Sequence, residues 1–371
     1  MQSVTYVTPP APHFRLLSLD PNRVRRRLIA VDANESRERI QMPKLSVTVA
    51  CEQYDRVQPI RDGRIEIEGC EVNFLALPPE ELFFRAYRNR EFDIAEISMS
   101  SYLLGLARGD TPYFAIPVFL SRLFRHSAIY VRTDRGITRP EDLKGRTVGV
   151  PEYQVTAALW ARALLDSEYG VTPADLIWLR GGLHEPGRIE KLSLNLPPEI
   201  RISAIGGTQT LDRMFADGEL DAMISPRAPR CFLERDPSIA LLFPRYREAE
   251  EAYYAKTKIF PIMHVLGIRR DLVEKHPWLA NSTYEAFVRS KRLALELLDD
   301  VAALKVTLPW LPAYLDETRA VMGDDFWPYG VKENLPTLQA MVHYAHKHGT
   351  TSRLLAVEEL FVPSTMERYK I

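Results

Sequence analysis

Two histidines stand where the sequence predicts strands to begin, and histidine is the side chain best suited to proton transfer near neutral pH. His126 and His264 each open a segment with the composition of a strand. Two carboxylates near other predicted strands, Glu96 and Asp55, could accept a proton from a bound molecule. Each residue also has a structural alternative, either a buried histidine that joins two strands or a carboxylate paired with an arginine.

Four arginines could hold an anionic ligand, because the planar guanidinium forms paired hydrogen bonds with a carboxylate. Arg227 follows a predicted strand and stands between two prolines, whereas Arg122 and Arg125 lie just before His126. Arg56 follows the first predicted strand. We expect Arg227 and Arg122 to matter most, although arginine is more often a solvated surface residue.

Several of these residues lie at junctions between a predicted strand and the segment after it. In open α/β sheets, ligands bind beyond the carboxyl ends of the strands, where loops and helix N-termini meet. Ser100 and Thr156 stand at two such helix starts, where they could contact a carboxylate or simply cap the helix. The predicted ligand contacts are Tyr54, Arg56, Ser98, Ser100, Arg122, Arg125, Tyr153, Gln154, Thr156 and Arg227.

The elements that would position these side chains alternate between strand and helix. Apolar patterns of period two or 3.6 predict strands at 45–51, 71–77, 92–97, 126–132, 146–150 and 264–268, with helices between most of them. Residues 182–204 are predicted to form an irregular excursion or hairpin, and the chain is predicted to be largely helical from 277 onward. This order is typical of an α/β protein with mostly parallel sheets.

Length and composition favour two lobes and exclude some functional classes. The chain has 371 residues, of which 46% are hydrophobic and 26% charged, and this length is too great for one comfortable core. The net charge of −1 predicts no general attraction to nucleic acid or to a membrane surface. No apolar run approaches the ~20 residues that a membrane-spanning helix needs.

Residues 1–43 are rich in proline and arginine and are predicted to form an N-terminal extension. They lack the basic region and apolar core of a signal peptide. The three cysteines, Cys51, Cys70 and Cys231, have no spacing typical of a disulfide scaffold or zinc site. We therefore expect a cytoplasmic protein, and an extension that packs on a neighbouring subunit would favour a homo-oligomer.

Two segments resemble the type II periplasmic binding proteins. Residues 141–150 (EDLKGRTVGV) resemble the entry into the second lobe of those proteins, and residues 215–222 (FADGELDA) resemble an approach to one of its strands. The resemblance implies a two-lobed α/β fold with a ligand cleft between the lobes. The implied parts are an extension at 1–43, a first lobe at 44–124 and 270–371, and a second lobe at 125–269.

A closer resemblance runs from about residue 45 to 364. The stretches that carry it are YDR at 54–56, FDIAEIS at 92–98, IPVF at 116–119, RLFRH at 122–126 and SPRAP at 225–229. They resemble the 4,5-dihydroxyphthalate decarboxylase family of the same superfamily. The resemblance implies an enzyme that removes CO2 from a hydroxylated aromatic dicarboxylate, converting 4,5-dihydroxyphthalate to 3,4-dihydroxybenzoate.

The implied reaction needs no organic cofactor, because the phenol of the substrate supplies electrons to its own ring. The site needs cations for two carboxylates, a general acid for the ring carbon and an acceptor for the phenolic proton. His126 or His264 would be the acid, and Glu96 or Asp55 the acceptor. A divalent metal held by His126, His264 and Glu96 is an alternative, although no local metal-binding motif demands one.

Two other functions are consistent with this fold. A non-catalytic receptor for a small carboxylate is the main alternative, and a thiamine-precursor synthesis protein is less favoured because the chain has no cysteine-rich motif of that kind. Ionisable histidine and glutamate at the predicted cleft favour the enzyme, since a receptor needs charge but no proton transfer.

Overall fold

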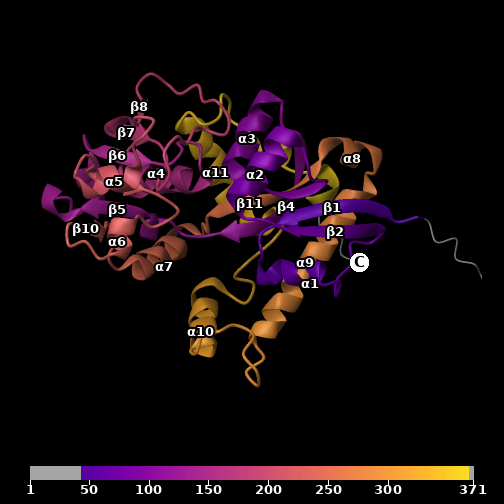
Figure 1. The fold of residues 1–371 in the computed structure, drawn as a ribbon. Coiled ribbons are helices and arrows are strands. Elements are labelled where there is room, and N and C mark those ends of the chain that lie inside the picture. The colour runs from indigo at the N-terminus through magenta and orange to yellow at the C-terminus, as the bar shows by residue number, and fades with distance from the viewer. Residues whose placement is uncertain (1–42, 367–371) are drawn as a thin grey trace, which may run out of the picture. The chain divides into compact units, whose positions relative to one another are not determined.

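The computed structural model describes residues 43–366. The N-terminal extension predicted at 1–43 therefore lies outside the described residues, apart from Pro43. The described residues contain two β-sheets, which form separate groups of strands in Figure 1.

The first sheet has the strand order β2-β1-β3-β11-β4. Its strands are β1 (Leu45–Cys51), β2 (Cys70–Ala76), β3 (Ile94–Ser98), β4 (Tyr113–Arg122) and β11 (Ile262–Arg269). β1 pairs in parallel with β2 and β3, whereas β11 runs antiparallel between β3 and β4. Every residue of β3 is buried, as expected for a central strand that is covered on both faces.

The second sheet has the strand order β10-β5-β9-β6-β7-β8. Its strands are β5 (Ile129–Arg132), β6 (Thr147–Val150), β7 (Ile177–Arg180), β8 (Arg201–Ala204), β9 (Ala222–Ile224) and β10 (Ile239–Leu241). β9, β6, β7 and β8 are parallel neighbours, whereas β5 is antiparallel to β9 and β10. Both sheets are therefore mixed, and the predicted parallel pairing accounts for only part of each.

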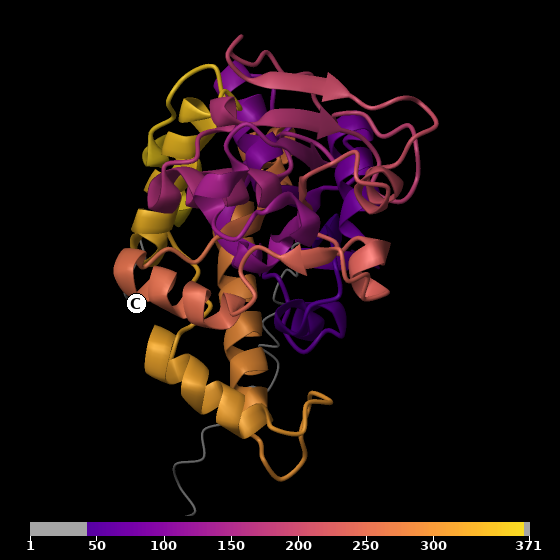
Figure 2. The ribbon, with the colours of Figure 1, turned by 90° about the vertical axis from the view of Figure 1, so that its left-hand side faces the viewer.

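The helices surround the sheets and dominate the C-terminal part, as the sequence predicts. They are α1 (Gln58–Arg61), α2 (Pro79–Phe84), α3 (Met99–Arg108), α4 (Thr156–Tyr169), α5 (Leu211–Ala216), α6 (Arg230–Leu233), α7 (Tyr246–Thr257), α8 (Arg270–Lys275), α9 (Trp278–Leu298), α10 (Leu311–Met322) and α11 (Leu335–Lys347). The end of α9 and all of α10 extend away from both sheets in Figures 1 and 2. Among the described helices, none combines the length and apolarity that crossing a membrane requires.

Each sheet has its own apolar core, and α4 belongs to both. Trp160 and Leu159 of α4 lie in the core of the first sheet, whereas Leu164 and Leu165 lie in the core of the second. The first ten residues of α4 are all buried, and all but Thr156 and Arg162 are apolar, as expected for a helix enclosed between two cores. The fold is therefore the predicted two-lobed α/β fold, with α4 packed into both lobes.

Three predicted elements differ from the observed ones. His126 lies in a 3-10 turn, His126–Ala128, and not in a strand, since β5 begins only at Ile129. β11 falls inside the range 125–269 predicted for the second lobe, yet it is hydrogen-bonded within the first sheet. The segment predicted as an excursion at 182–204 ends in a regular strand, β8, which pairs with β7.

Candidate active site

A cavity of about 540 Å³ lies where strand ends from both sheets meet. The first sheet contributes Ser98 at the end of β3, Ser121 near the end of β4 and His264 near the start of β11. The second sheet contributes the segments that follow β6, β7 and β9. This is the place that the strand-end rule predicts for a ligand.

His264 is held at the cavity wall by a buried carboxylate. Its Nδ1 lies 2.5 Å from Oε1 of Glu96, and Glu96 is 0% exposed. The hydroxyl of Tyr54 donates to the same Oε1 at 2.7 Å, and the backbone N–H of Glu52 donates to Oε2 at 2.9 Å. This arrangement fixes the ring of His264 and leaves Nε2 available to a molecule in the cavity.

The electrostatics of this group favour an ionised Glu96. Burial alone would raise the pKa of Glu96, but the hydrogen bonds and charge of His264, with the donors of Glu52 and Tyr54, hold that pKa below its ordinary value. Burial and the neighbouring Glu96 raise the pKa of the Tyr54 hydroxyl, so Tyr54 stays protonated and remains a donor. An ionised Glu96 orients the ring of His264, so that an acid on this ring would deliver its proton toward the cavity.

Arg125 brings a buried positive charge to the cavity. Its side chain lines the cavity although the residue is only 8% exposed. Within the described residues, the only hydrogen bond of its guanidinium is from Nε to Sδ of Met263, at 3.2 Å. Burial lowers the pKa of Arg125 to about 10, so it is still a cation at neutral pH. Glu250 attracts this charge from a distance, but Arg125 forms no ion pair among the described residues. A buried cation without an ion pair is costly, and an anionic ligand would supply one.

Further cations face the same cavity. Arg188, Lys191 and Arg227 also line the cavity. Arg188 pairs with Glu80 at 3.0 Å and with Glu152, which also binds Lys191. Arg227 is 62% exposed and lies 3.8 Å from Glu80, so it can turn toward a ligand. Two carboxylates, on Glu80 and Glu185, are in the same lining, and the cavity is positive overall.

Apolar side chains complete the lining and suit an aromatic ring. They are Phe83, Phe84, Leu123, Val155, Leu183 and Met263, with several prolines. The ring of Phe83 meets that of His264 edge to face, with 4.8 Å between their centroids. A flat apolar molecule that carries negative groups therefore matches both components of this surface.

A hydroxyl network joins the N-termini of α3 and α4 beside the cavity. Ser98 and Thr156 line the cavity, and their hydroxyls lie 3.1 Å apart. The hydroxyl of Ser100 lies 2.9 Å from that of Thr156 and donates to the carbonyl of Gln154. Ser100 thus links segments of the two lobes and is not part of the lining, whereas Ser98 and Thr156 are placed as the sequence predicts.

The structure does not bring Arg122, Arg56 or Asp55 to the cavity. Arg122 is buried, and its guanidinium donates to the carbonyls of Pro328 and Phe260 and to Oδ1 of Asn334. Arg56 donates to the carbonyl of Leu120, pairs with Asp55 at 3.0 Å and stacks on Trp327. These groups join chain segments outside the cavity, which corrects the expectation that Arg122 would be a leading ligand contact.

Three other predicted site residues also make contacts within the protein. They are Tyr153, Gln154 and His126. Tyr153 is buried, and its hydroxyl donates to the carbonyl of His348. The amide of Gln154 donates to Glu190 and to the carbonyl of Leu192. His126 is packed between Phe243 and Tyr253, and burial lowers its pKa to about 4.

The segment after β7 contributes several residues to the cavity, none of which was predicted as a site residue from the sequence. Its lining residues run from Gly182 to Arg188, followed by Lys191. A Cβ on Gly182 would lie 1.6 Å from the carbonyl oxygen of Glu185, so the turn requires glycine. The signal was the sequence GGLHEPGR, in which glycines and proline shape a turn that carries histidine and arginine.

The metal alternative depends on His126, His264 and Glu96 forming one cluster. Among residues 43–366 no group of three His, Cys, Asp or Glu side chains is arranged to hold a metal ion. Glu96 and His264 are in contact, but His126 faces α7, where Glu250 lies 3.8 Å away. The residues present do not fit the predicted metal site.

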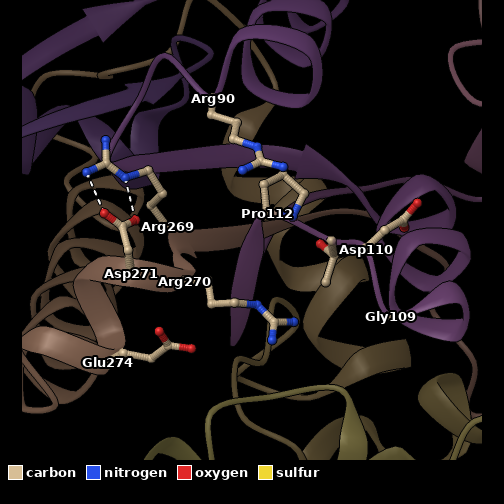
Figure 3. Close-up of a pocket in the computed structure, with 9 residues that line it drawn as sticks. Arg90, Gly109, Asp110, Pro112, Arg269, Arg270, Asp271 and Glu274 are labelled. Carbon is tan, nitrogen blue, oxygen red and sulfur yellow. Dashed lines mark hydrogen bonds and ion pairs between the residues drawn. The ribbon is translucent and has the colours of Figure 1, made fainter.

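A second hollow, of about 570 Å³, lies at the opposite ends of β3, β4 and β11. Figure 3 shows its charged residues, among which Arg269 is bound to Asp271 by two hydrogen bonds. Arg90 is exposed, and the guanidinium of Arg270 lies over the ring of Phe114. Its three arginines are matched by Asp110, Asp271 and Glu274, and it contains no histidine.

Two sheets with separate cores and a ligand-sized cavity between strand ends define the class of this protein as type II periplasmic-binding-protein-like. A family model described as "ABC transporter, phosphonate, periplasmic substrate-binding protein" matches residues 66–185. A solved structure of a DszB mutant in complex with biphenyl-2-sulfinic acid has a TM-score of 0.51 at 16% identity, covering 87% of this chain and 98% of that one.

Comparison with curated proteins is more specific. A 4,5-dihydroxyphthalate decarboxylase of Comamonas testosteroni is 46% identical over 330 residues, which are 89% of this chain and 100% of the relative. The protein of the same name from Pseudomonas putida is 46% identical over 219 residues, 59% of this chain and 85% of that protein. The chain belongs to the 4,5-dihydroxyphthalate decarboxylase family. This membership confirms the resemblance noted in the sequence and does not favour the receptor alternative.

Proposed function

We propose that this protein is a carboxy-lyase that converts 4,5-dihydroxyphthalate to 3,4-dihydroxybenzoate and CO2. Family membership across 89% of the chain supports the reaction. The observation that carries the proposal is the His264–Glu96 pair, which faces a cavity that also holds the buried cation of Arg125. An acid and an anchor for a carboxylate are the two groups that this chemistry needs.

Binding would begin with the two carboxylates of the substrate. Arg125 takes one of them, because desolvated charges attract strongly and the guanidinium can form two parallel hydrogen bonds. Arg227, at the mouth, takes the other. Phe83, Leu123 and Leu183 then hold the ring, and the crowded neighbouring carboxylates are turned out of the ring plane.

The chemical step would use the phenol of the substrate as its electron source. The hydroxyl para to one carboxylate loses its proton, and the ring carbon that bears this carboxylate takes a proton from His264. The carbon–carboxylate bond then breaks, CO2 leaves, and the aromatic ring is restored. Glu96 is a positioning residue that orients His264, and general acid catalysis of this kind contributes about 10²–10⁴-fold in rate.

This mechanism requires neither an organic cofactor nor a metal. Electrons flow within the substrate, so no external electron sink is needed. The arginines and His264 supply the positive charge that a metal ion would otherwise provide.

The direct experiment is to incubate the purified full-length protein with 4,5-dihydroxyphthalate and to measure 3,4-dihydroxybenzoate by chromatography. We expect stoichiometric formation of product and CO2. Binding of the dicarboxylate without turnover, with and without added divalent metals, would contradict a decarboxylase and restore the receptor hypothesis.

We also propose that the protein is a homo-oligomer. Large apolar side chains are exposed between α9 and α10, including Val301 at 69%, Leu304 at 43% and Trp310 at 69%. These residues lie in the part that extends from the sheets in Figure 2, and a second copy of the chain would cover them. Light scattering should give a mass above that of one chain, and Trp310→Ser should lower it.

The buried free thiols of Cys51, Cys70 and Cys231 support a cytoplasmic location, where thiols stay reduced. A role in the catabolism of phthalates follows from the proposed substrate. Cell fractionation tests the location, and protein found outside the cytoplasm would contradict it.

A further inference from the structure

A second histidine–carboxylate pair reaches the same cavity from the other lobe. His184 lines the cavity within the segment that follows β7, and its Nδ1 lies 3.4 Å from Oδ2 of Asp212. We infer that His184 is a second catalytic residue, the base that takes the phenolic proton of the substrate while His264 protonates the ring. This inference rests on the proposed function and assigns a step that it leaves open.

The backbone places His184 firmly. The N–H groups of Leu211 and Asp212, at the start of α5, donate to the carbonyls of Gly182 and Leu183 at 2.9 and 3.0 Å. These two bonds attach the turn before His184 to the helix that carries Asp212. The imidazole is 25% exposed, whereas Asp212 is 13% exposed, so the carboxylate lies behind the ring on the side away from solvent.

Asp212 is itself oriented by its neighbours. Its Oδ1 accepts the backbone N–H of Arg230 at 2.7 Å, which turns Oδ2 toward His184. A carboxylate beside Nδ1 favours the tautomer with its proton on Nδ1, and Nε2 is then an unprotonated acceptor. Asp212 is therefore a positioning residue for His184, as Glu96 is for His264.

The other carboxylates near the cavity are poorly suited to accept the phenolic proton. Glu96 already holds His264, and Asp55 is paired with Arg56 outside the cavity. Glu80 is paired with Arg188, and Glu185 is exposed to solvent at the mouth. An imidazole also matches the acidity of a phenol better than a carboxylate does.

Four cations line the cavity together with His184. They are Arg125, Arg188, Lys191 and Arg227. Their positive charge stabilises the phenolate that forms when His184 takes the proton.

The proton and electron balance closes with two histidines. Nε2 of His184 takes the proton of the hydroxyl para to the departing carboxylate, and the oxygen pair moves into the ring as the ring carbon takes a proton from His264. Cleavage of the carbon–carboxylate bond releases CO2 and returns the electron pair to the ring and the phenolate oxygen. His184 gives its proton back to this oxygen, and solvent reprotonates His264.

The test compares His184→Gln and Asp212→Asn with a matched control, His343→Gln, in the full-length protein. His343 is an exposed histidine on α11 and should leave kinetics unchanged. With 4,5-dihydroxyphthalate, His184→Gln should lower kcat by about 10²–10⁴-fold, with a much smaller change in KM. Asp212→Asn should lower kcat less and shift the acidic limb of the kcat/KM profile.

The pH dependence of the rate separates a base from a contact residue. The kcat/KM profile should have an acidic limb with the unaltered protein and with His343→Gln, because a base must be unprotonated, and this limb should be absent with His184→Gln. If His184→Gln fails to fold, the pH profile of Asp212→Asn decides instead, and a profile identical to that of the unaltered protein overturns the assignment.

Failure of this inference is distinguishable from failure of the proposed function. An unaltered protein that makes product, together with a His184→Gln variant that keeps kcat and only raises KM, would overturn the role of His184 alone. An unaltered protein that makes no 3,4-dihydroxybenzoate would overturn the decarboxylase and the role of His184 together.

Discussion

The first sheet has a hollow at each end of its central strands, and the two hollows differ in chemistry rather than in size. Their volumes are about 540 Å³ for the cavity shared with the second sheet and about 570 Å³ for the hollow around Arg90. In the first, Arg125 is buried and forms no ion pair among the described residues. In the second, Arg269 is bound to Asp271 (Figure 3) and the remaining arginines are at least partly exposed.

The difference shows what identifies a site in this molecule. An exposed arginine is hydrated and is stabilised little by an anion. A buried arginine that forms no ion pair has lost its hydration, and an anionic ligand stabilises it more. The cavity between the sheets also holds histidines backed by carboxylates, whereas the hollow around Arg90 has none. We therefore assign the function to the cavity between the sheets, because it contains a buried cation and histidines that are paired with carboxylates.

The strongest test of this contrast is to replace His264. His264→Gln should lower kcat by about 10²–10⁴-fold, because the ring carbon loses its acid. KM should change little, since Arg125 and Arg227 still bind the carboxylates. Steady-state kinetics measure this effect, with His343→Gln as the control. An unchanged kcat in His264→Gln would show that His264 is not the acid.

A second test contrasts the catalytic pair with a buried pair outside the cavity, His126 and Glu250. Burial lowers the pKa of His126 to about 4 and raises that of Glu250 to about 7. The unfolded state binds more protons at His126, so its contribution to stability is present above pH 6.5 and is lost as the pH falls toward 4. Glu250 has the opposite sign, since its contribution is present below pH 4.5 and is lost as the pH rises through 7.

Replacing His126 or Glu250 alone should reveal the contribution of each residue to the pH dependence of stability. His126→Gln should lose less stability on acidification from pH 6.5 to 4, and Glu250→Gln should lose less on going from pH 4.5 to 7. Each difference should be up to about 3 kcal/mol, from roughly 1.4 kcal/mol per unit of pKa shift. Urea unfolding across this pH range measures them, and identical pH profiles for both variants would contradict the buried-pair interpretation.

The third test compares the two hollows directly through their arginines. Arg125→Gln should weaken binding of 4,5-dihydroxyphthalate by about 1.5–3 kcal/mol, the usual worth of a hydrogen bond to a charged group. Arg90→Gln in the other hollow should leave binding unchanged. Calorimetric titration of both variants checks this, and a loss of binding at Arg90 alone would reverse the assignment.

The smallest expected effect is that of metal removal. Dialysis against a chelator should leave kcat unchanged, because residues 43–366 offer no suitable cluster of ligands and the proposed steps use only side chains and substrate. Activity that disappears with the chelator and returns with a divalent metal would show that the mechanism is incomplete.

The sequence predicted the fold better than the site. Period-two patterns located β1 and β6, and family resemblance supplied the two-lobed arrangement. For the site, His264, Glu96 and Arg125 were predicted and do meet at the cavity or directly behind its wall. Arg122 was expected beside them. Its position in the sequence could not reveal that its guanidinium donates hydrogen bonds to Pro328, Phe260 and Asn334.

His184 illustrates the opposite error. It lies in a segment without periodicity, and only tertiary structure brings it opposite β11 and beside Asp212, which is 28 residues further along the chain. Helix and strand patterns report which faces are buried, but they do not report which loops converge. Residues contributed by such loops are therefore the ones that sequence patterns miss most easily.

The most direct test of the central claim is a crystal structure of His264→Gln with 4,5-dihydroxyphthalate bound, since this variant should retain the unreacted substrate. We predict electron density in the cavity between the two sheets, with one substrate carboxylate within hydrogen-bond distance of Arg125. The carbon bearing a carboxylate should face position 264. Substrate bound in the hollow around Arg90 and Arg270, with the cavity beside Arg125 empty, would contradict the account.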